Sequence, residues 1–121
     1  MTIGHVTANG HAQIQIVVED SNEGTHDVVA LLDTGFNGAL ALPAQRIASL
    51  GLKGRGQVTA VLASGEEHNV PAYRATVRIG GTRHSVVVAE AGESLVGMGL
   101  LWGFDLRIQC MDGGHVDLEH L

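Results

Sequence analysis

A carboxylate next to a small, flexible turn is the part of this sequence best suited to chemistry. Asp33-Thr34-Gly35 follows directly on the apolar run 28–32, and a second apolar stretch occupies 39–42. This pattern predicts that a buried strand carries Asp33 into a turn, after which the chain returns to the core. An ionisable group at the end of a buried strand is costly unless it is satisfied or used in a reaction.

Two aspartates can perform a reaction that a single aspartate cannot. When two carboxyl groups lie about 3 Å apart they share a proton, so one acts as an acid and the other as a base. Such a pair can activate water and protonate a leaving amine. Asp-Thr-Gly occurs once here, so the pair requires a two-fold dimer that brings Asp33 against its own copy. The alternative is that Asp33 only caps its own turn, an ordinary use of Asp before Gly.

Short apolar or alternating runs between glycine-containing turns predict an all-β fold around this turn. We expect strands at 13–18, 27–33, 58–62, 72–79, 84–90, 106–110 and 115–121, the last two forming a hairpin. Two short helices are expected, one at 43–50 between Pro43 and Gly51 and one at 98–104. The combination favours a small closed β-barrel with one or two short helices.

Length and charge limit the classes of function. The 121 residues predict one domain, 1–121, and the net charge of −6 without a basic cluster argues against nucleic-acid partners and against a membrane surface. The sequence does not begin with basic residues followed by an apolar region, and no apolar run approaches the roughly 20 residues that span a bilayer. We therefore expect a cytoplasmic protein.

The remaining reactive side chains do not point to a second chemistry. The seven histidines lack the spacing of a zinc site, so no metal is expected. Cys110 is the single cysteine, which excludes an intrachain disulfide, and its alternating context favours a small buried hydrophobe over a nucleophile. Trp102 is expected to pack in the core or at a dimer interface.

Two motifs in order resemble the retropepsin-like (clan AA) aspartic proteases, most of all the small bacterial and archaeal single-domain members. The segment 28–35 is similar to the active-site strand and turn of that family. Leu95-Val96-Gly97, followed by 98–101, resembles its hydrophobic-hydrophobic-glycine element and the short helix after it. Residues 58–79 resemble the flap hairpin, with Ala63-Ser64-Gly65 at its tip, so the resemblance covers about 12–108.

The resemblance implies a homodimeric aspartic endopeptidase in which paired Asp33 carboxylates activate a water that attacks a peptide bond of a polypeptide substrate. It implies no metal and no cofactor. By position, Asp33 is catalytic and Thr34 and Gly35 shape the active-site turn. Substrate contacts would come from Phe36, Asn37 and the flap tip Ala63, Ser64 and Gly65. Leu95, Val96 and Gly97 would support the site from beneath.

Several positions depart from the family pattern and keep other functions open. Phe36 stands where many relatives have a small residue, and its ring would narrow the primary substrate pocket. Met98 replaces an arginine, and the C-terminal hairpin is longer than the terminal strand of viral relatives, which leaves the mode of dimerisation open. The alternative is a catalytically inactive dimeric β-barrel that acts as a peptide-binding or scaffolding module. A third interpretation is an enzyme that cleaves only itself or one operon partner.

Overall fold

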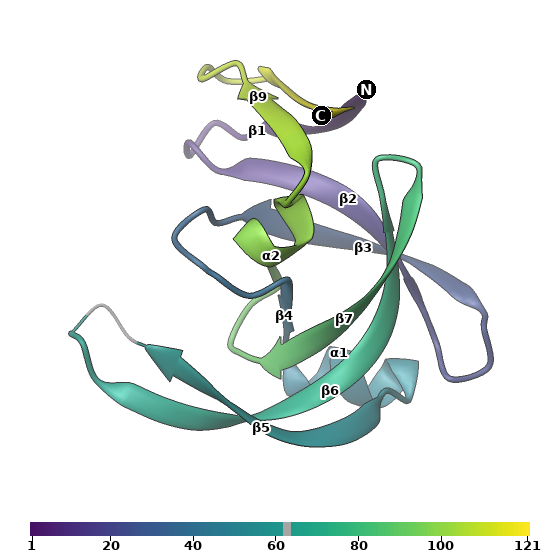
Figure 1. The fold of residues 1–121 in the computed structure, drawn as a ribbon. Coiled ribbons are helices and arrows are strands. Elements are labelled where there is room, and N and C mark those ends of the chain that lie inside the picture. The colour runs from purple at the N-terminus through teal and green to yellow at the C-terminus, as the bar shows by residue number, and fades with distance from the viewer. Residues whose placement is uncertain (62–63) are drawn as a thin grey trace.

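The structure is a computed structural model that describes residues 1–61 and 64–121, and strands dominate it (Figure 1). The fold is all-β in class, as the sequence predicted, with two short helices inserted between strands. The elements are β1 (Thr2–Val6), β2 (Ala12–Glu19), β3 (Thr25–Leu32), β4 (Leu40–Leu42), α1 (Ala44–Leu50), β5 (Lys53–Val61), β6 (Glu67–Ile79), β7 (Thr82–Glu90), β8 (Leu95–Val96), α2 (Met98–Leu101), β9 (Phe104–Ile108) and β10 (His115–His120).

The strands of the described residues form one sheet in the order β5-β6-β7-β4-β8-β3-β2-β1-β10-β9. An additional pairing joins β6 to β2, with Val17 opposite Arg78 and Val18 opposite Val77. The pairings from β2 through β3, β8, β4 and β7 to β6 and back to β2 therefore make a closed circuit. Most neighbours are antiparallel, but β8 runs parallel to β3, and β4 runs parallel to β7.

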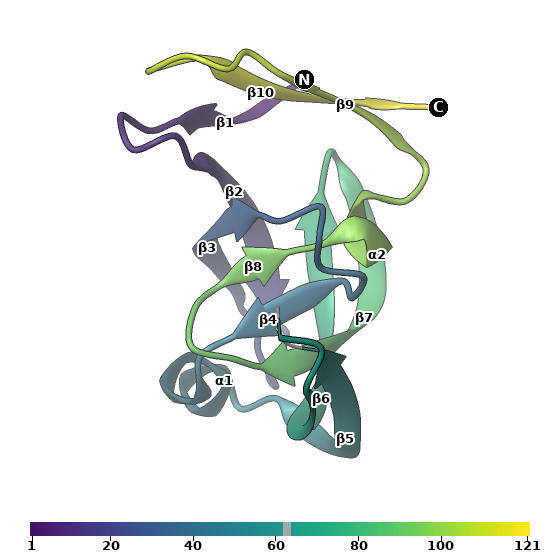
Figure 2. The same ribbon diagram turned by 90° about the vertical axis from the view of Figure 1, so that its left-hand side faces the viewer.

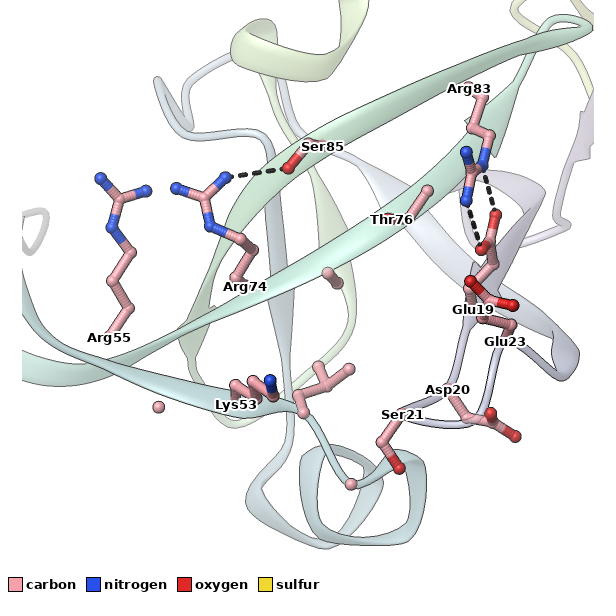
Figure 3. A pocket seen from close by; sticks show the side chains of 14 residues that line it. Glu19, Asp20, Ser21, Glu23, Lys53, Arg55, Arg74, Thr76, Arg83 and Ser85 are labelled. Carbon is pink, nitrogen blue, oxygen red and sulfur yellow. Dashed lines mark hydrogen bonds and ion pairs between the residues drawn. The ribbon is translucent and has the colours of Figure 1, made fainter.

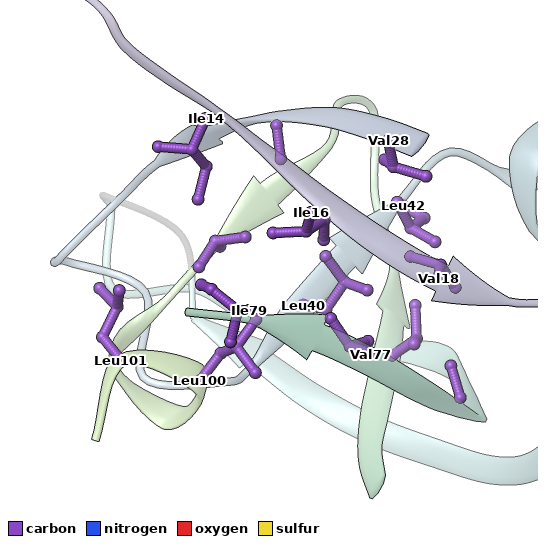
Figure 4. Close-up of a cluster of buried hydrophobic side chains, with 14 of the residues drawn as sticks. Ile14, Ile16, Val18, Val28, Leu40, Leu42, Val77, Ile79, Leu100 and Leu101 are labelled. Atoms are coloured by element: carbon purple, nitrogen blue, oxygen red, sulfur yellow. The ribbon is translucent and has the colours of Figure 1, made fainter. Parts of the chain in front are cut away.

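The core lies inside this circuit and follows the alternation of the strands (Figure 4). Along β2, Ile14, Ile16 and Val18 are buried while Gln13 and Gln15 are exposed. Burying one such aliphatic side chain stabilises a fold by about 1.5–3 kcal/mol. Side chains from β3, β4, β6, β7, β8 and α2 complete the cluster, including Val28, Leu40, Leu42, Val77, Val88, Val96 and Leu100.

Helix α1 closes one end of the core and begins and ends where the sequence predicts. Pro43 is its N-cap, where a missing N–H costs nothing. Gly51 ends it in the left-handed region at φ 63°, where its N–H donates to the carbonyl of Ala48. Ile47 and Leu50 face the core, so this short helix is held mainly by packing.

Three strands from the two ends of the chain lie together beyond the main body (Figure 2). β1 pairs with β2 on one side and with β10 on the other, and β10 pairs with β9. The predicted C-terminal hairpin is confirmed, with Leu118 opposite Leu106. The sequence did not predict β1, β4 or β8. The last two are three and two residues long, too short to show a period.

Helix α2 is shorter than expected, and the helix prediction for 102–104 is wrong. The helix ends at Leu101, Trp102 is extended, and Gly103 has φ 89°, a conformation that glycine adopts easily. Phe104 then begins β9, two residues earlier than the predicted strand. Trp102 is 79% exposed, so the expectation of a core position is wrong for this chain. Cys110 is exposed as well and is not the buried hydrophobe expected.

One carboxylate is buried at the end of β2. Glu19 is only 6% exposed, and its two oxygens accept hydrogen bonds of 2.7 and 2.8 Å from the Arg83 guanidinium. Arg78 adds an ion pair at 3.4 Å. The Arg83 hydrogen bonds lower the pKa of Glu19 below its usual value, against the opposing effect of burial. This pair clamps the β2 end to the β6–β7 hairpin.

Candidate active site

The loop that carries Asp33 is held by β8, which lies between β3 and β4. Leu31 and Leu32 of β3 pair with Leu95 and Val96, and Leu40 of β4 pairs with Val96 from the other side. The Asp33 N–H donates to the Val96 carbonyl at 2.9 Å. The chain therefore leaves the sheet at Asp33 and re-enters it at Leu40, with β8 fixing both points.

The Asp33 side chain closes a tight turn on itself. Its Oδ1 accepts a hydrogen bond of 2.9 Å from the Gly35 N–H, and the Phe36 N–H donates to the Asp33 carbonyl at 3.0 Å. This is the turn-capping arrangement common for Asp before Gly. No described residue donates a side-chain or backbone hydrogen bond to Oδ2. Thr34 and Gly35 are exposed, and Asp33 is half-buried. Turn capping thus occupies Oδ1 and leaves Oδ2 without a hydrogen-bond partner among the described residues.

Backbone hydrogen bonds fasten the rest of the loop to the segment after β8. Met98 donates to the Phe36 carbonyl at 2.8 Å, Gly97 to Ala39 at 3.1 Å, and Gly99 to Gly38 at 3.0 Å. The approach at Gly97 leaves no room for a side chain, since a Cβ there would collide with the carbonyl oxygens of Phe36 and Gly38. The glycine of Leu95-Val96-Gly97 therefore permits the two segments to interlock.

Asp33 opens onto a cavity of about 520 Å³ between this loop and the β5–β6 hairpin. The opposite wall is formed by residues of β5 and β7, and Asp33 is the one ionisable group among the described lining residues. The lining consists of Asp33, Gly35, Phe36, Asn37, Gly38, Ala39, Leu40, Val58, Thr59, Ala60, Val61, Val87, Ala89 and Leu95. A mostly apolar cavity with one carboxylate at its edge suits a substrate with an apolar side chain.

The Phe36 ring both lines the cavity and packs on the loop. A Cβ added to Gly38 or to Gly97 would lie only 2.6 Å from the nearest atom of the ring, so the ring fills the space beside both glycines. The ring is half-buried. The ring thus packs against the loop and lines the cavity at the same time.

A family model described as aspartyl protease matches residues 6–101, which include Asp33, its loop and the whole of β8. The match covers well over half of the chain. The chain belongs to the aspartyl protease family. The resemblance to retropepsin-like domains is thereby confirmed at the level of the family. No curated protein and no solved structure matches the chain.

In this member of the aspartyl protease family, the expected site residues other than the flap tip divide into two groups. Asp33, Gly35, Phe36, Asn37 and Leu95 line the cavity. The others lie around it: Thr34 is exposed on the turn, and Val96 and Gly97 are buried beneath the loop. The structure therefore brings the loop and β8 together at one site.

The expected flap tip is not part of the described lining. Ser64 and Gly65 are exposed, the latter at φ 85°, and neither lines the cavity. Ala63 lies outside the described residues. The part of the hairpin that does face Asp33 is the strand Val58–Val61.

Two wall residues on β7 were not predicted from the sequence. Val87 and Ala89 point to the face opposite the buried Val88. The apolar run Val86-Val87-Val88 could have indicated them. A strand with one face in solvent would carry a polar residue at position 87, so a valine there indicates that both faces are covered. Across residues 1–61 and 64–121, no three His, Cys, Asp or Glu side chains gather closely enough to hold a metal ion. No helix in the same residues is long and apolar enough to cross a bilayer.

Proposed function

We propose that this chain is an aspartic endopeptidase that hydrolyses peptide bonds as a homodimer with one Asp33 from each copy. The observation that carries the proposal is the position of Asp33, presented at the mouth of an apolar cavity by a turn fixed to β8. Membership in the aspartyl protease family supports it. Thr34 and Gly35 would shape the turn, and Leu95, Val96 and Gly97 would hold it in place.

In the proposed reaction the two carboxyl groups carry one proton between them. The ionised carboxylate takes a proton from water, whose oxygen attacks the carbonyl carbon, while the protonated carboxyl donates to the carbonyl oxygen. The tetrahedral intermediate then collapses as the leaving amine takes the proton that the first carboxyl accepted from water, while a hydroxyl of the intermediate returns its proton to the second carboxylate, so the pair again shares one proton. The Gly35 N–H on Oδ1 would keep each carboxyl oriented through both steps.

The cavity supplies a site for one apolar side chain of the substrate. Val58 and Ala60 of β5 and Val87 and Ala89 of β7 would contact it, with Phe36 limiting its size. Asn37 would offer an amide to the substrate backbone at the rim. Ser64 and Gly65 at the hairpin tip would contact the polypeptide outside the cavity.

The second copy is proposed to approach along the face that bears Asp33 and α2. Met98 and Trp102 at the two ends of α2 are 37% and 79% exposed, and the Met98 N–H binds the Asp33 loop directly. Exposed large apolar side chains beside a functional loop are typical of an interaction surface. We further propose that residues 1–121 fold as one domain in which the closed circuit of pairings forms a small β-barrel.

The direct test is digestion of an unbiased peptide mixture by concentrated protein from acid to neutral pH, with sequencing of the products. The comparison protein is Asp33→Asn. Asparagine keeps an oxygen that accepts the Gly35 N–H but cannot relay a proton, so the turn survives and turnover falls by about a thousandfold or more. Thermal unfolding and sedimentation of both proteins check that fold and assembly are unchanged.

Cleavage by wild type that persists in Asp33→Asn would refute the proposed catalytic role. No cleavage by a wild-type dimer that still binds peptides would favour the second candidate, a non-catalytic peptide-binding module. The observation in favour of that candidate is the Phe36 ring, which occupies part of the cavity next to Asp33.

A further inference from the structure

A second cavity, of about 400 Å³, is lined mainly by polar and charged side chains of the β2–β3 turn, β5, β6 and β7 (Figure 3). Lys53, Arg55 and Arg74 form its basic side, with Ser85 beside them. Glu19, Asp20 and Glu23 lie across from them. We call this space the basic cavity, and none of its lining residues lines the Asp33 cavity.

The basic side is unusual in a chain with this charge. The sequence has seven Lys and Arg against thirteen Asp and Glu, yet four of those seven cations line one cavity, and one of the four, Arg83, is paired with Glu19. Among the described residues, Lys53, Arg55 and Arg74 form no ion pair. These three side chains therefore line the cavity without a described carboxylate in direct contact with them.

Two of the three acidic groups across the cavity, Glu19 and Asp20, are already engaged. Glu19 is bound by Arg83 at 2.7 Å and by Arg78 at 3.4 Å. Asp20 accepts backbone hydrogen bonds within its turn and lies 2.8 Å from His26 Nε2. Glu23 carries the remaining carboxylate on that side. On this acidic wall Glu19 is paired with arginine and Asp20 is held within its own turn, so Glu23 is the carboxylate left to oppose the basic side.

The basic side chains are also positioned by a hydrogen bond and by a bulge in the backbone. The Arg74 guanidinium donates to Ser85 Oγ at 2.8 Å, which fixes its direction (Figure 3). Arg55 sits in a bulge of β5, where the register shifts between Gly54 and Gln57 and Gly56 has φ 83°. A bulge places two residues opposite one and changes which side chains share a face.

This bulge puts the basic side and the Asp33 cavity on one face of the sheet. Lys53 is opposite Arg74 and Val58 is opposite Val70, and residues 70 and 74 share a face because an even number of positions separates them. Lys53 and Val58 are an odd number apart, so without the bulge they would face opposite ways. Val87, a wall of the Asp33 cavity, is directly opposite Arg74. The two cavities are therefore neighbours along one surface.

We infer that the basic cavity binds acidic side chains of the polypeptide substrate at a distance from the bond that is cleaved. This inference rests on the proposed function, because it treats the two cavities as parts of one substrate-binding surface. Neighbouring strands are about 4.8 Å apart, and an extended chain advances about 3.3 Å per residue. We therefore expect the acidic residue of the substrate some two to four positions along the chain from the apolar residue that enters the Asp33 cavity. Guanidinium groups suit carboxylates because their donors match both oxygens.

The test uses the double variant Arg55→Gln/Arg74→Gln and, as a matched control, Arg107→Gln. Arg107 is an exposed arginine of β9 that lines neither cavity. In a digest of a peptide mixture, wild type and Arg107→Gln should enrich Asp or Glu at least two positions from the cleaved bond. The double variant should lose that enrichment, with kcat/KM for acidic peptides reduced about three- to tenfold and kcat/KM for their Asn/Gln counterparts unchanged.

A binding measurement separates this inference from the proposed function. Labelled acidic and amide-matched peptides are titrated into Asp33→Asn and into Asp33→Asn/Arg55→Gln/Arg74→Gln, at low and high salt. Tighter binding of the acidic peptide, lost in the second protein and weakened by salt, supports the inference even if wild type cleaves nothing. Equal affinity for both peptides overturns it even if wild type is an active protease. If the acidic and the amide-matched peptides bind equally and inorganic phosphate alone binds the basic cavity, that cavity is a site for a free anion. This result would also overturn the inference.

Discussion

Phe36 is the residue on which the size of the proposed substrate pocket depends. Truncation to Ala removes a half-buried ring from the loop and enlarges the cavity, at a cost to stability of about 1–3 kcal/mol. We expect cleavage by Phe36→Ala to shift toward peptides with larger apolar side chains, by about tenfold in the kcat/KM ratio. Phe36→Leu should shift it less. Product sequencing measures both, and an unchanged preference would show that the ring does not limit the pocket.

Glu19 links stability to acidity, which matters for a protein of this family. Its pKa is lowered from 4.5 by the Arg83 hydrogen bonds, so its contribution to stability is complete above that value and is lost as the pH falls through the folded-state pKa. Glu19→Gln cannot titrate. We therefore expect Glu19→Gln to have the lower Tm at neutral pH and the gap to wild type to narrow as the pH falls below 4.5. Circular dichroism melts measure this, with exposed Glu93→Gln as the control. Parallel curves would contradict it.

Among the elements, β8 contributes most to the site for its length. Its following glycine leaves no space between the two interlocked segments, so Gly97→Ala should destabilise the fold by about 1–3 kcal/mol and displace the Asp33 loop. Gly92→Ala is the matched control, since a Cβ there meets nothing within 4 Å. Its stability should stay within about 0.5 kcal/mol of wild type. Urea unfolding compares the three proteins, and equal losses in both variants would refute the packing argument.

The same element shows why sequence could predict the site only in part. Asp33 was found because a long apolar strand ends in an Asp-Gly turn, and α1 because Pro43 and Gly51 mark its ends. A two-residue strand such as β8 has no period of its own, and its motif was found through a family resemblance. The bulge at Arg55 depends on how β5 pairs with β6, and the residues around Arg55 in the sequence do not indicate that pairing. Long-range pairing decides what local propensity leaves open.

At the scale of the whole molecule, activity is expected to depend on assembly. If two copies supply the aspartates, the rate should rise more steeply than linearly with concentration near the dimer Kd. Trp102→Asp should raise that Kd at least tenfold and reduce activity in proportion at low concentration. Met111→Asp, which alters an exposed methionine in the β9–β10 turn, is the control and should leave the dimer intact. Sedimentation velocity measures both, and dissociation by the Met111 variant alone would place the interface at the hairpin.

The position of β8 also governs when the protein can begin to work. The Asp33 N–H donates the hydrogen bond that fixes this residue to the carbonyl of Val96, more than sixty residues later in the chain. On the ribosome, the aspartate emerges long before the strand that orients it, and pairing at such separation is slow to form. If the chain cleaves peptide bonds as proposed, a nascent chain that has exposed Asp33 remains inactive until Val96 has also emerged, which protects the growing polypeptide from early cleavage.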